Sequence, residues 1–143
     1  MKNKIIGYTA GVFDLFHIGH LNILKRAKAE CDYLIVAVST DELVEEYKNK
    51  MPVIPYDERK AIVESIKYVD KVVPQINRNK IAAWEKYKFD KMFVGDDWKG
   101  SELFAKLEIE FGEKGVEIVY FPYTKGTSST LLKGILSKIY NEK

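Results

Sequence analysis

Short apolar runs alternate along the chain with longer segments in which apolar residues recur with a helical period. The run DYLIVAV at residues 32–38 is of the kind found in parallel strands that are covered on both faces. Residues 21–30 instead place Leu21, Leu24 and Ala27 on one helical face, with lysines elsewhere. The pattern predicts strands at residues 4–11, 32–38, 71–74, 90–95 and 116–122, and helices at residues 21–30, 57–69, 79–89, 101–115 and 128–140.

The segment after the second predicted strand gives more detailed expectations. Ser39 and Glu42 have the spacing of a capping box, which predicts a short helix that begins there. Residues 46–56 contain two prolines and are interpreted as a polar loop. The helix predicted next should bury one apolar face made of Ile62, Val63, Ile66 and Val69.

The regular alternation of strands and helices predicts the fold class. The 143 residues contain no linker, internal repeat or low-complexity segment, which indicates a single domain. Alternating strands and helices predict an α/β protein with a parallel β-sheet and helices on both faces. In such open sheets, ligands bind beyond the carboxyl ends of the strands. The segments TAGVFDLFHIGH, STDE, GDDWKG and YTKGTSST fall at those ends, so the site is expected there.

Charge balance and cysteine usage narrow the class of protein further. The chain has 23 basic and 21 acidic residues, which is too even to indicate nucleic acid or a membrane surface as a partner. No apolar run approaches the roughly 18 residues of a membrane span, and Gly7, Thr9 and Asp14 interrupt the first apolar stretch too early for a signal peptide. Cys31 is the only cysteine, so we expect no intrachain disulfide and a cytoplasmic location.

The two histidines of the chain, His17 and His20, fall three residues apart where the first strand should give way to a helix. This spacing puts both on one face of a helix start, where free N–H groups and the helix dipole attract anions. Gly19 allows close approach of the backbone, and Gly11 allows a tight turn. A surface coincidence and a zinc site with Asp14 remain alternatives, although catalytic zinc usually takes three protein ligands. We favour phosphate binding and expect no metal ligand among these residues.

The stretch GVFDLFHIGHLNILKRAK, with HIGH at residues 17–20, resembles the nucleotidylyltransferase superfamily and the cytidylyltransferases within it. Further matches follow in order along nearly the whole chain: VSTDE, YDER, YVD, VGDDW and TKGTSST. Bacterial cytidylyltransferases that act on glycerol 3-phosphate are the most similar branch, and those for phosphocholine and phosphoethanolamine are more distant. The resemblance implies a Rossmann-like, nucleotide-binding catalytic domain over residues 1–143.

The resemblance also implies a reaction without a covalent enzyme intermediate. The phosphate of a small alcohol attacks the α-phosphate of CTP, which is accompanied by Mg²⁺, and pyrophosphate leaves. Glycerol 3-phosphate is the favoured acceptor, and its product CDP-glycerol serves teichoic acid or capsule-type polymers. Glycerol 2-phosphate, other polyol phosphates, phosphocholine, an ATP-dependent adenylyltransferase and a non-catalytic nucleotide sensor remain alternatives. Family members pair through the region after Arg59, so a homodimer is expected.

Site residues follow from the resemblance, position by position. The expected catalytic residues are His17, His20, Lys48 and Arg59, with Lys48 favoured over Lys50 on the predicted loop. The expected nucleotide-binding residues are Thr9, Ala10, Gly11, Val12, Phe13, Asp14, Gly19, Lys50, Gly95, Asp97, Trp98, Thr124, Gly126, Ser128, Ser129 and Thr130. Asp41, Lys67 and Asp70 are expected to bind the acceptor.

Four positions depart from the family pattern. Tyr123 replaces an arginine, Thr127 an isoleucine, Val12 a threonine and Lys67 an arginine. A lysine keeps the charge of arginine but loses its bidentate geometry. The arginine missing at position 123 leaves the identity of the acceptor open.

Ordinary structural roles remain for two of these motifs. The hydroxyls of residues 128–130 suit a helix N-cap, which does not exclude phosphate binding at the same helix end. In GDDW, Trp98 suits packing on the core beside a polar turn. Asp96 and Asp97 could instead help to hold Mg²⁺, because hard cations take oxygen ligands.

Overall fold

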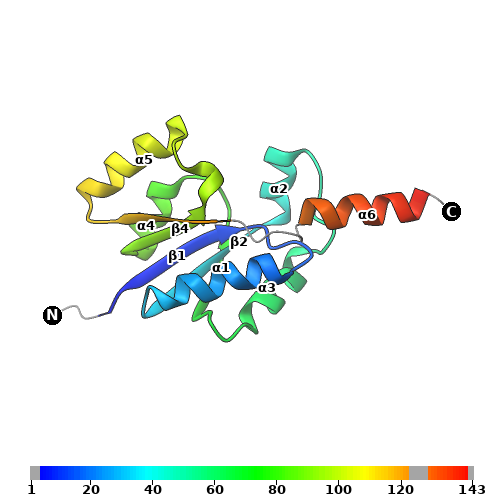
Figure 1. The fold of residues 1–143 in the computed structure, drawn as a ribbon, viewed down its shortest axis with the longest axis horizontal. Helices are drawn as coiled ribbons and strands as arrows, with labels where there is room; N and C mark the ends of the chain where they lie inside the picture. The colour runs from blue at the N-terminus through cyan, green and yellow to red at the C-terminus, as the bar shows by residue number, and fades with distance from the viewer. Residues whose placement is uncertain (1–3, 123–128, 142–143) are drawn as a thin grey trace.

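The computed structural model describes residues 4–122 and 129–141 as a parallel sheet between two layers of helices (Figure 1). Five strands lie in the order β3-β2-β1-β4-β5, and every neighbouring pair is parallel. The elements are β1 (Ile6–Gly11), α1 (Ile18–Ala29), β2 (Tyr33–Ser39), α2 (Asp41–Lys48), α3 (Tyr56–Glu64), β3 (Lys71–Gln75), α4 (Lys80–Tyr87), β4 (Lys91–Gly95), the 3-10 turn η1 (Asp96–Trp98), α5 (Glu102–Glu113), β5 (Glu117–Phe121) and α6 (Ser129–Asn141). The predicted α/β fold with a parallel sheet is confirmed.

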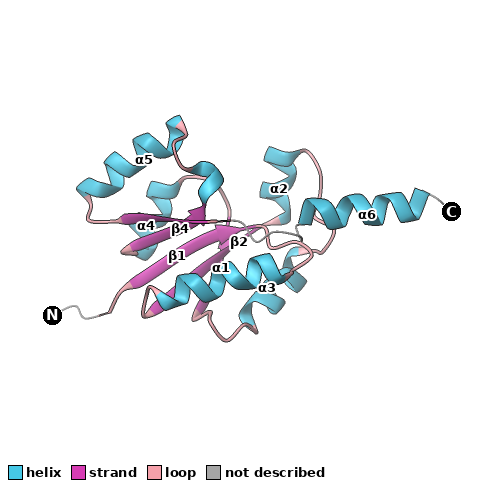
Figure 2. Ribbon diagram, in the orientation of Figure 1, coloured by secondary structure: helices cyan, strands magenta, loops and turns pink. Residues whose placement is uncertain are grey.

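Strand β2 shows why a continuous apolar run forms a central strand. Successive side chains of a strand point to opposite faces of the sheet. Leu34 and Val36 pack into a core under α1 and α3, whereas Ile35 and Ala37 pack into a second core under α4 and α5. Figure 2 shows these helices on opposite faces of the sheet. Both faces of β2 are therefore covered, as the sequence predicts.

The order of the strands places a crevice beyond β1 and β4. Strand β1 pairs with β2 on one side and with β4 on the other. The connection through α1 leaves β1 toward β2, and the one through α5 leaves β4 toward β5, in opposite directions along the sheet. Ligands of open α/β sheets bind where the strand order reverses in this way.

Two expectations about α2 are wrong in detail. The N-cap is Thr40, whose side chain accepts the N–H of Leu43 at 3.2 Å, and not Ser39. Ser39 is the last residue of β2, and its hydroxyl instead donates to Gln75 at 2.6 Å. Lys48 closes the helix instead of lying in a loop.

Helix α3 is shorter than its apolar pattern predicts. It ends at Glu64, where the hydroxyl of Ser65 donates to the carbonyl of Ile62. The side chain of Ile62 is 41% exposed, so it lies outside the core that Val63 and Ile66 enter. The helical period therefore continues in the sequence beyond the point at which local hydrogen bonding stops the helix.

Candidate functional site

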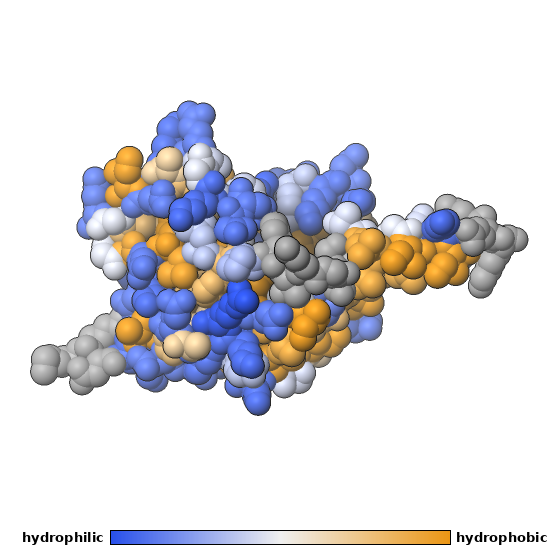
Figure 3. Space-filling model, viewed as in Figure 1, coloured by the Kyte–Doolittle hydropathy of each residue, from blue (hydrophilic) through white to orange (hydrophobic). Residues whose placement is uncertain are grey.

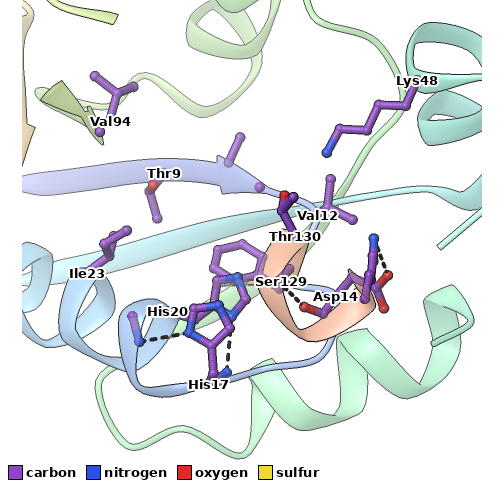
Figure 4. Close-up of a pocket in the computed structure, with 16 residues that line it drawn as sticks. Thr9, Val12, Asp14, His17, His20, Ile23, Lys48, Val94, Ser129 and Thr130 are labelled. Atoms are coloured by element: carbon purple, nitrogen blue, oxygen red, sulfur yellow. Dashed lines mark hydrogen bonds and ion pairs between the residues drawn. The ribbon is translucent and has the colours of Figure 1, made fainter. Parts of the chain in front are cut away.

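A pocket of about 590 Å³ lies at the carboxyl ends of β1 and β4, in the range of small-molecule sites. Strand β1 and the segment after it, α1, α2, β4 and α6 all contribute to its wall (Figure 4). Its lining residues are Thr9, Ala10, Gly11, Val12, Phe13, Asp14, His17, Gly19, His20, Ile23, Lys48, Val94, Gly95, Ser129, Thr130 and Lys133. Two segments more than 100 residues apart in sequence, at the openings of α1 and α6, thus share one pocket.

The segment between β1 and α1 has an unusual backbone. Phe13 and Leu15 both adopt positive φ angles, 54° and 52°, which residues other than glycine seldom adopt. Phe13 is buried against His20 and Phe16. Asp14 between them is 2% exposed and accepts the N–H groups of Val53 and Ile54. These contacts hold a strained turn in place, as is common at functional sites.

His17 and His20 form a reciprocal cap at the start of α1. His17 is the N-cap, and its Nδ1 accepts the N–H of Gly19 at 3.0 Å. Nδ1 of His20 accepts the N–H of His17 at 3.2 Å, and the ring centroids lie 4.0 Å apart. Because each Nδ1 is an acceptor, the proton of each neutral ring resides on Nε2. Both rings therefore offer an Nε2–H donor from the pocket wall.

The surroundings of the two rings favour their neutral forms. Burial lowers the pKa of His20 to about 4, and neighbouring His17 lowers it further. Burial also lowers the pKa of His17 from 6.5. A neutral imidazole can still donate a hydrogen bond to a phosphate oxygen, whereas a charged one would have to give up its Nδ1 acceptor. Positive charge in the pocket comes instead from lysine side chains and the helix ends.

Arg59 lies behind the pocket and not in its lining. Its side chain is fully buried and donates to the carbonyls of Val12, Ser39 and Ile54. Its Nη2 also pairs with Asp41 at 2.6 Å. Every guanidinium nitrogen is thus used within the protein, and Arg59 is not among the lining residues where the triphosphate contact was expected. Arg59 and Asp41 instead fix the turns that carry Val12 and Ile54.

The two lysines near the end of α2 occupy different places. Lys48 lines the pocket, and in Figure 4 its amino group points toward Val12 and Thr130. Partial desolvation lowers the pKa of Lys48, and Lys133 adds to this effect. Lys50 is exposed and does not line the pocket. The preference for Lys48 over Lys50 thus agrees with the geometry.

The first turns of α6 reach the pocket through Ser129, Thr130 and Lys133. The hydroxyl of Ser129 donates to the carbonyl oxygen of Asp14 at 2.5 Å. Lys133 forms an ion pair of 2.8 Å with the Asp14 carboxylate, and the sequence reasoning missed this residue. It lies four residues after Ser129, and the same-face rule for helices could have found it.

The GDDW segment contributes fewer residues to the pocket lining than the family resemblance predicts. Gly95 lines the pocket, but Asp97 and Trp98 in η1 do not. Trp98 is 38% exposed and packs against Phe104 of α5, with ring centroids 5.3 Å apart. Within residues 4–122 and 129–141, no group of three or more histidine, cysteine or acidic side chains is placed to hold a metal ion. The structure thus favours the packing role for Trp98.

Lys67 and Asp70 lie away from the pocket, contrary to the expected acceptor contacts. Asp70 accepts the N–H of Leu34 at the amino end of β2 and pairs with Lys28 at the end of α1. Exposed Lys67 sits over the ring of Tyr68, just before the amino end of β3. The pocket opens at the other end of these strands. Within one chain, therefore, neither residue reaches an acceptor bound there.

Three expected nucleotide-binding residues lie outside the residues that the structure describes. They are Thr124, Gly126 and Ser128, in the segment between β5 and α6. Tyr123 and Thr127, which depart from the family pattern, lie in the same segment. No helix among the described residues is long and apolar enough to cross a membrane.

The fold and the pocket define a Rossmann-like α/β protein in which two helix starts and two lysines line one pocket, an arrangement that suits an anionic ligand. A family model described as cytidylyltransferase-like matches residues 8–135, so the chain belongs to that family. It is 42% identical over 131 residues to the glycerol-3-phosphate cytidylyltransferase of Bacillus spizizenii, covering 91% of this chain and 94% of the relative. The corresponding enzyme of Staphylococcus aureus is 40% identical over 126 residues, covering 87% and 89%.

Solved structures agree with this assignment at the level of the fold. The lipopolysaccharide core biosynthesis protein of Thermoplasma volcanium has a TM-score of 0.71 at 26% identity, covering 87% of this chain and all of that one. A pantothenate synthetase of Thermus thermophilus has a TM-score of 0.65 at 14% identity, covering 88% and 58%, and shows the fold alone. The expected family and fold are both confirmed.

Proposed function

We propose that the protein transfers CMP from CTP to glycerol 3-phosphate, which gives CDP-glycerol and pyrophosphate. The observation that carries this proposal is the pair of Nε2–H donors on His17 and His20 in the pocket that also receives the start of α6. Relatives that cover most of the chain at 40–42% identity are named for this reaction.

The proposed CMP transfer requires the protein to stabilise negative charge more than to transfer a proton. An oxygen of the acceptor phosphate attacks the α-phosphorus of CTP, and the bond between that phosphorus and the oxygen bridging to the β-phosphate breaks. The acceptor phosphate is ionised at neutral pH, so no strong general base is needed. Negative charge is redistributed over the phosphoryl oxygens, which preorganised donors stabilise. His17 and His20 supply two such donors, and Lys48 supplies a cation.

We propose that the cytidine of CTP lies along the wall of the pocket formed by β1 and β4. The carboxyl ends of β1 and β4, at Gly11 and Gly95, border the pocket without bulky side chains. A Cβ atom added to Gly11 would come within 3.0 Å of the Phe13 ring, so a larger residue there would disturb the turn. These residues support a nucleoside position beside the sheet, with the phosphates toward α1 and α6.

We propose that Mg²⁺ enters with CTP, as part of the substrate. Mg²⁺ typically keeps several waters and is held by phosphates with one or two carboxylates. Among the described lining residues, Asp14 carries the one carboxylate, which already accepts two backbone N–H groups and an ion pair from Lys133. The phosphates of CTP would therefore supply most of the ligands of Mg²⁺ that are not water.

A pyrophosphate-release screen tests the proposal. CTP and ATP are each combined with glycerol 3-phosphate, glycerol 2-phosphate, ribitol phosphate, phosphocholine and phosphoethanolamine. We expect release with CTP and glycerol 3-phosphate to exceed that of every other pair by at least tenfold. Faster pyrophosphate release with another acceptor would identify that acceptor as the substrate in place of glycerol 3-phosphate. Nucleotide binding without release from any pair would favour the non-catalytic sensor.

We also propose a homodimer. The family resemblance predicts pairing through the region after Arg59, and we propose instead that two copies cover an apolar surface of α6. Helix α6 extends from the body of the protein, and its surface is strongly hydrophobic (Figures 1 and 3). Its side chains Leu131, Ile135, Leu136 and Ile139 are about half exposed, at 47–52%. Surfaces of this kind mark interaction sites in soluble proteins. Sedimentation velocity at micromolar concentration should show twice the chain mass, and a monomer would contradict the proposal.

A further inference from the structure

We infer that Arg78, in the loop after β3, is a positioning residue that acts through the ring of Tyr47 to hold Lys48 in the pocket. The inference rests on the proposed function, in which Lys48 supplies a cation to the phosphates of CTP. No motif in the sequence marks Arg78 or Tyr47. Neither is among the described residues that line the pocket, so their effect on a substrate must pass through another side chain.

The first support is the way in which α2 is anchored. Figure 1 shows this helix standing apart from the helices that cover the two faces of the sheet. Its first half is fixed by the Thr40 N-cap and by the buried side chains of Leu43 and Val44. In the second half, Tyr47 is half-buried and the other side chains, Lys48 included, are exposed. Helix ends with few buried contacts open readily, so the direction of Lys48 depends on what Tyr47 packs against.

The second support is the contact between Tyr47 and the loop after β3. The guanidinium carbon of Arg78 lies 4.5 Å from the centroid of the Tyr47 ring, within the range of cation–π contacts. The Nζ atom of Lys48 lies 5.7 Å from the same centroid. A planar guanidinium stacks on an aromatic ring and restricts its orientation. The loop after β3 thus holds the last turn of α2, from which Lys48 extends.

The third support is the charge around Lys48. Desolvation lowers the pKa of Lys48, and Lys133 and Arg78 both act in the same direction. Arg78 is therefore close enough to Lys48 for the two cations to repel each other. The negative face of the Tyr47 ring attracts both cations and compensates part of this repulsion. Without this stack, Lys48 would keep its charge but lose the support of its helical turn.

Direct contact of Arg78 with the substrate is the competing explanation. In that case, replacing Arg78 would cost the same factor whether or not Lys48 is present, because the two side chains would contribute independently. If Arg78 acts through Lys48, its replacement has little further effect once Lys48 is gone. The double variant Lys48→Met/Arg78→Met therefore separates the two explanations.

Four single variants complete the series. Arg78→Met removes the charge and keeps an unbranched side chain, and Tyr47→Leu removes the ring. Tyr47→Phe keeps the ring and is the conservative replacement. Exposed Lys86 of α4 lies over the ring of Tyr87 at 5.5 Å, so Lys86→Met is the matched control for a surface cation–π pair.

Initial rates with CTP as the varied substrate measure the cycle. We expect Arg78→Met and Tyr47→Leu each to lower kcat/KM for CTP about fivefold, the scale of a cation–π contact. In the Lys48→Met background, Arg78→Met should cost less than about twofold more. Tyr47→Phe and Lys86→Met should stay within about twofold of the wild type. A full fivefold loss in the Lys48→Met background would overturn the inference, as would normal kcat/KM in Arg78→Met.

Calorimetric titration with CTP repeats the cycle on Kd, without turnover. A wild-type protein that binds CTP but releases no pyrophosphate with any acceptor would refute the proposed reaction. The inference would then be upheld by losses of affinity that do not add between Arg78→Met and Lys48→Met, and overturned by losses that add. A wild-type protein that does not bind CTP would overturn both.

Hydrogen exchange tests the contact itself, without any ligand. We expect the amides of residues 45–50 to exchange at least about threefold faster in Arg78→Met than in the wild type, because the end of α2 opens more often. The amides of α1 should be unchanged, and Lys86→Met should match the wild type throughout. Equal exchange at residues 45–50 in Arg78→Met and the wild type would show that Arg78 does not hold this turn and would overturn the inference.

Discussion

The backbone N–H of His17 donates to Nδ1 of His20 at 3.2 Å, while the His17 ring accepts the N–H of Gly19. One residue thus caps the helix with its side chain, and the other returns the contact from the first turn. This relationship makes the two histidines structural and functional at once. Their Nδ1 atoms hold the start of α1, which leaves the Nε2–H groups for a ligand.

Replacing His17 by asparagine should separate these two roles. Asparagine is a favourable N-cap, so the free energy of unfolding should change by less than about 1 kcal/mol. The Nε2–H donor is lost, and we expect kcat with CTP and glycerol 3-phosphate to fall by at least about 10²-fold. Steady-state kinetics and urea unfolding measure the two effects. A reduction in kcat below tenfold would count against the assigned role.

His20 predicts a loss of stability in mild acid. The unfolded chain binds a proton at His20 near pH 6.5, whereas the folded protein resists it until about pH 4. Stability should therefore fall as the pH drops below 6.5, by about 2 kcal/mol at pH 5 relative to pH 8. Urea unfolding at several pH values measures this change, and His20→Gln should show a shallower decline over the same interval. If the free energies of unfolding of the wild type and of His20→Gln fell equally over this interval, the lowered pKa of His20 would be contradicted.

Arg59 predicts a large effect on stability. Arg59→Met would leave the Asp41 carboxylate and three backbone carbonyls without their partner. Breaking a buried pair from one side typically costs about 3–5 kcal/mol, and denaturant unfolding should show a loss of that size. Arg26→Met, at an exposed position of α1, is the control and should change stability by less than about 0.5 kcal/mol. An Arg59 variant of normal stability but poor CTP binding would instead restore the triphosphate role.

We expect replacement of Lys48 and of Lys50, near the end of α2, to have unequal effects on kcat/KM for CTP. Lys48→Met removes a cation from the pocket wall and should lower kcat/KM for CTP at least about tenfold, the scale of a charge-assisted hydrogen bond. Lys50→Met removes an exposed lysine outside the lining and should lower it less than threefold. Initial-rate kinetics with CTP as the varied substrate distinguish the two. Equal losses would place both residues on the substrate.

The sequence predicted those features that depend on local periodicity. The continuous apolar run of β2 and the order of strands and helices identified the sheet, its covered faces and the crevice at its carboxyl edge. The histidine pair was located because residues three apart at a helix start lie on the same face of the helix. Gly95 and Thr130 were placed correctly at the pocket by the family resemblance and the crevice rule.

Features that depend on tertiary contacts were not predictable in the same way. Nothing local in YDERK shows that Arg59 turns inward to the carbonyls of Val12, Ser39 and Ile54. The positive φ angles of Phe13 and Leu15 occur at residues that normally avoid them, so no turn signal marks them. Lys133 becomes visible only when α6 is docked on Asp14.

The central claim is that two neutral imidazoles present Nε2–H donors to the phosphates of CTP. The chain contains two histidines, so ¹⁵N-histidine NMR of the untagged protein observes these rings alone. At pH 7 the account predicts that both rings are neutral Nε2–H tautomers and that the Nε2–H signals of both shift when CTP is added. A charged ring, an Nδ1–H tautomer or a ring unaffected by saturating CTP would contradict it.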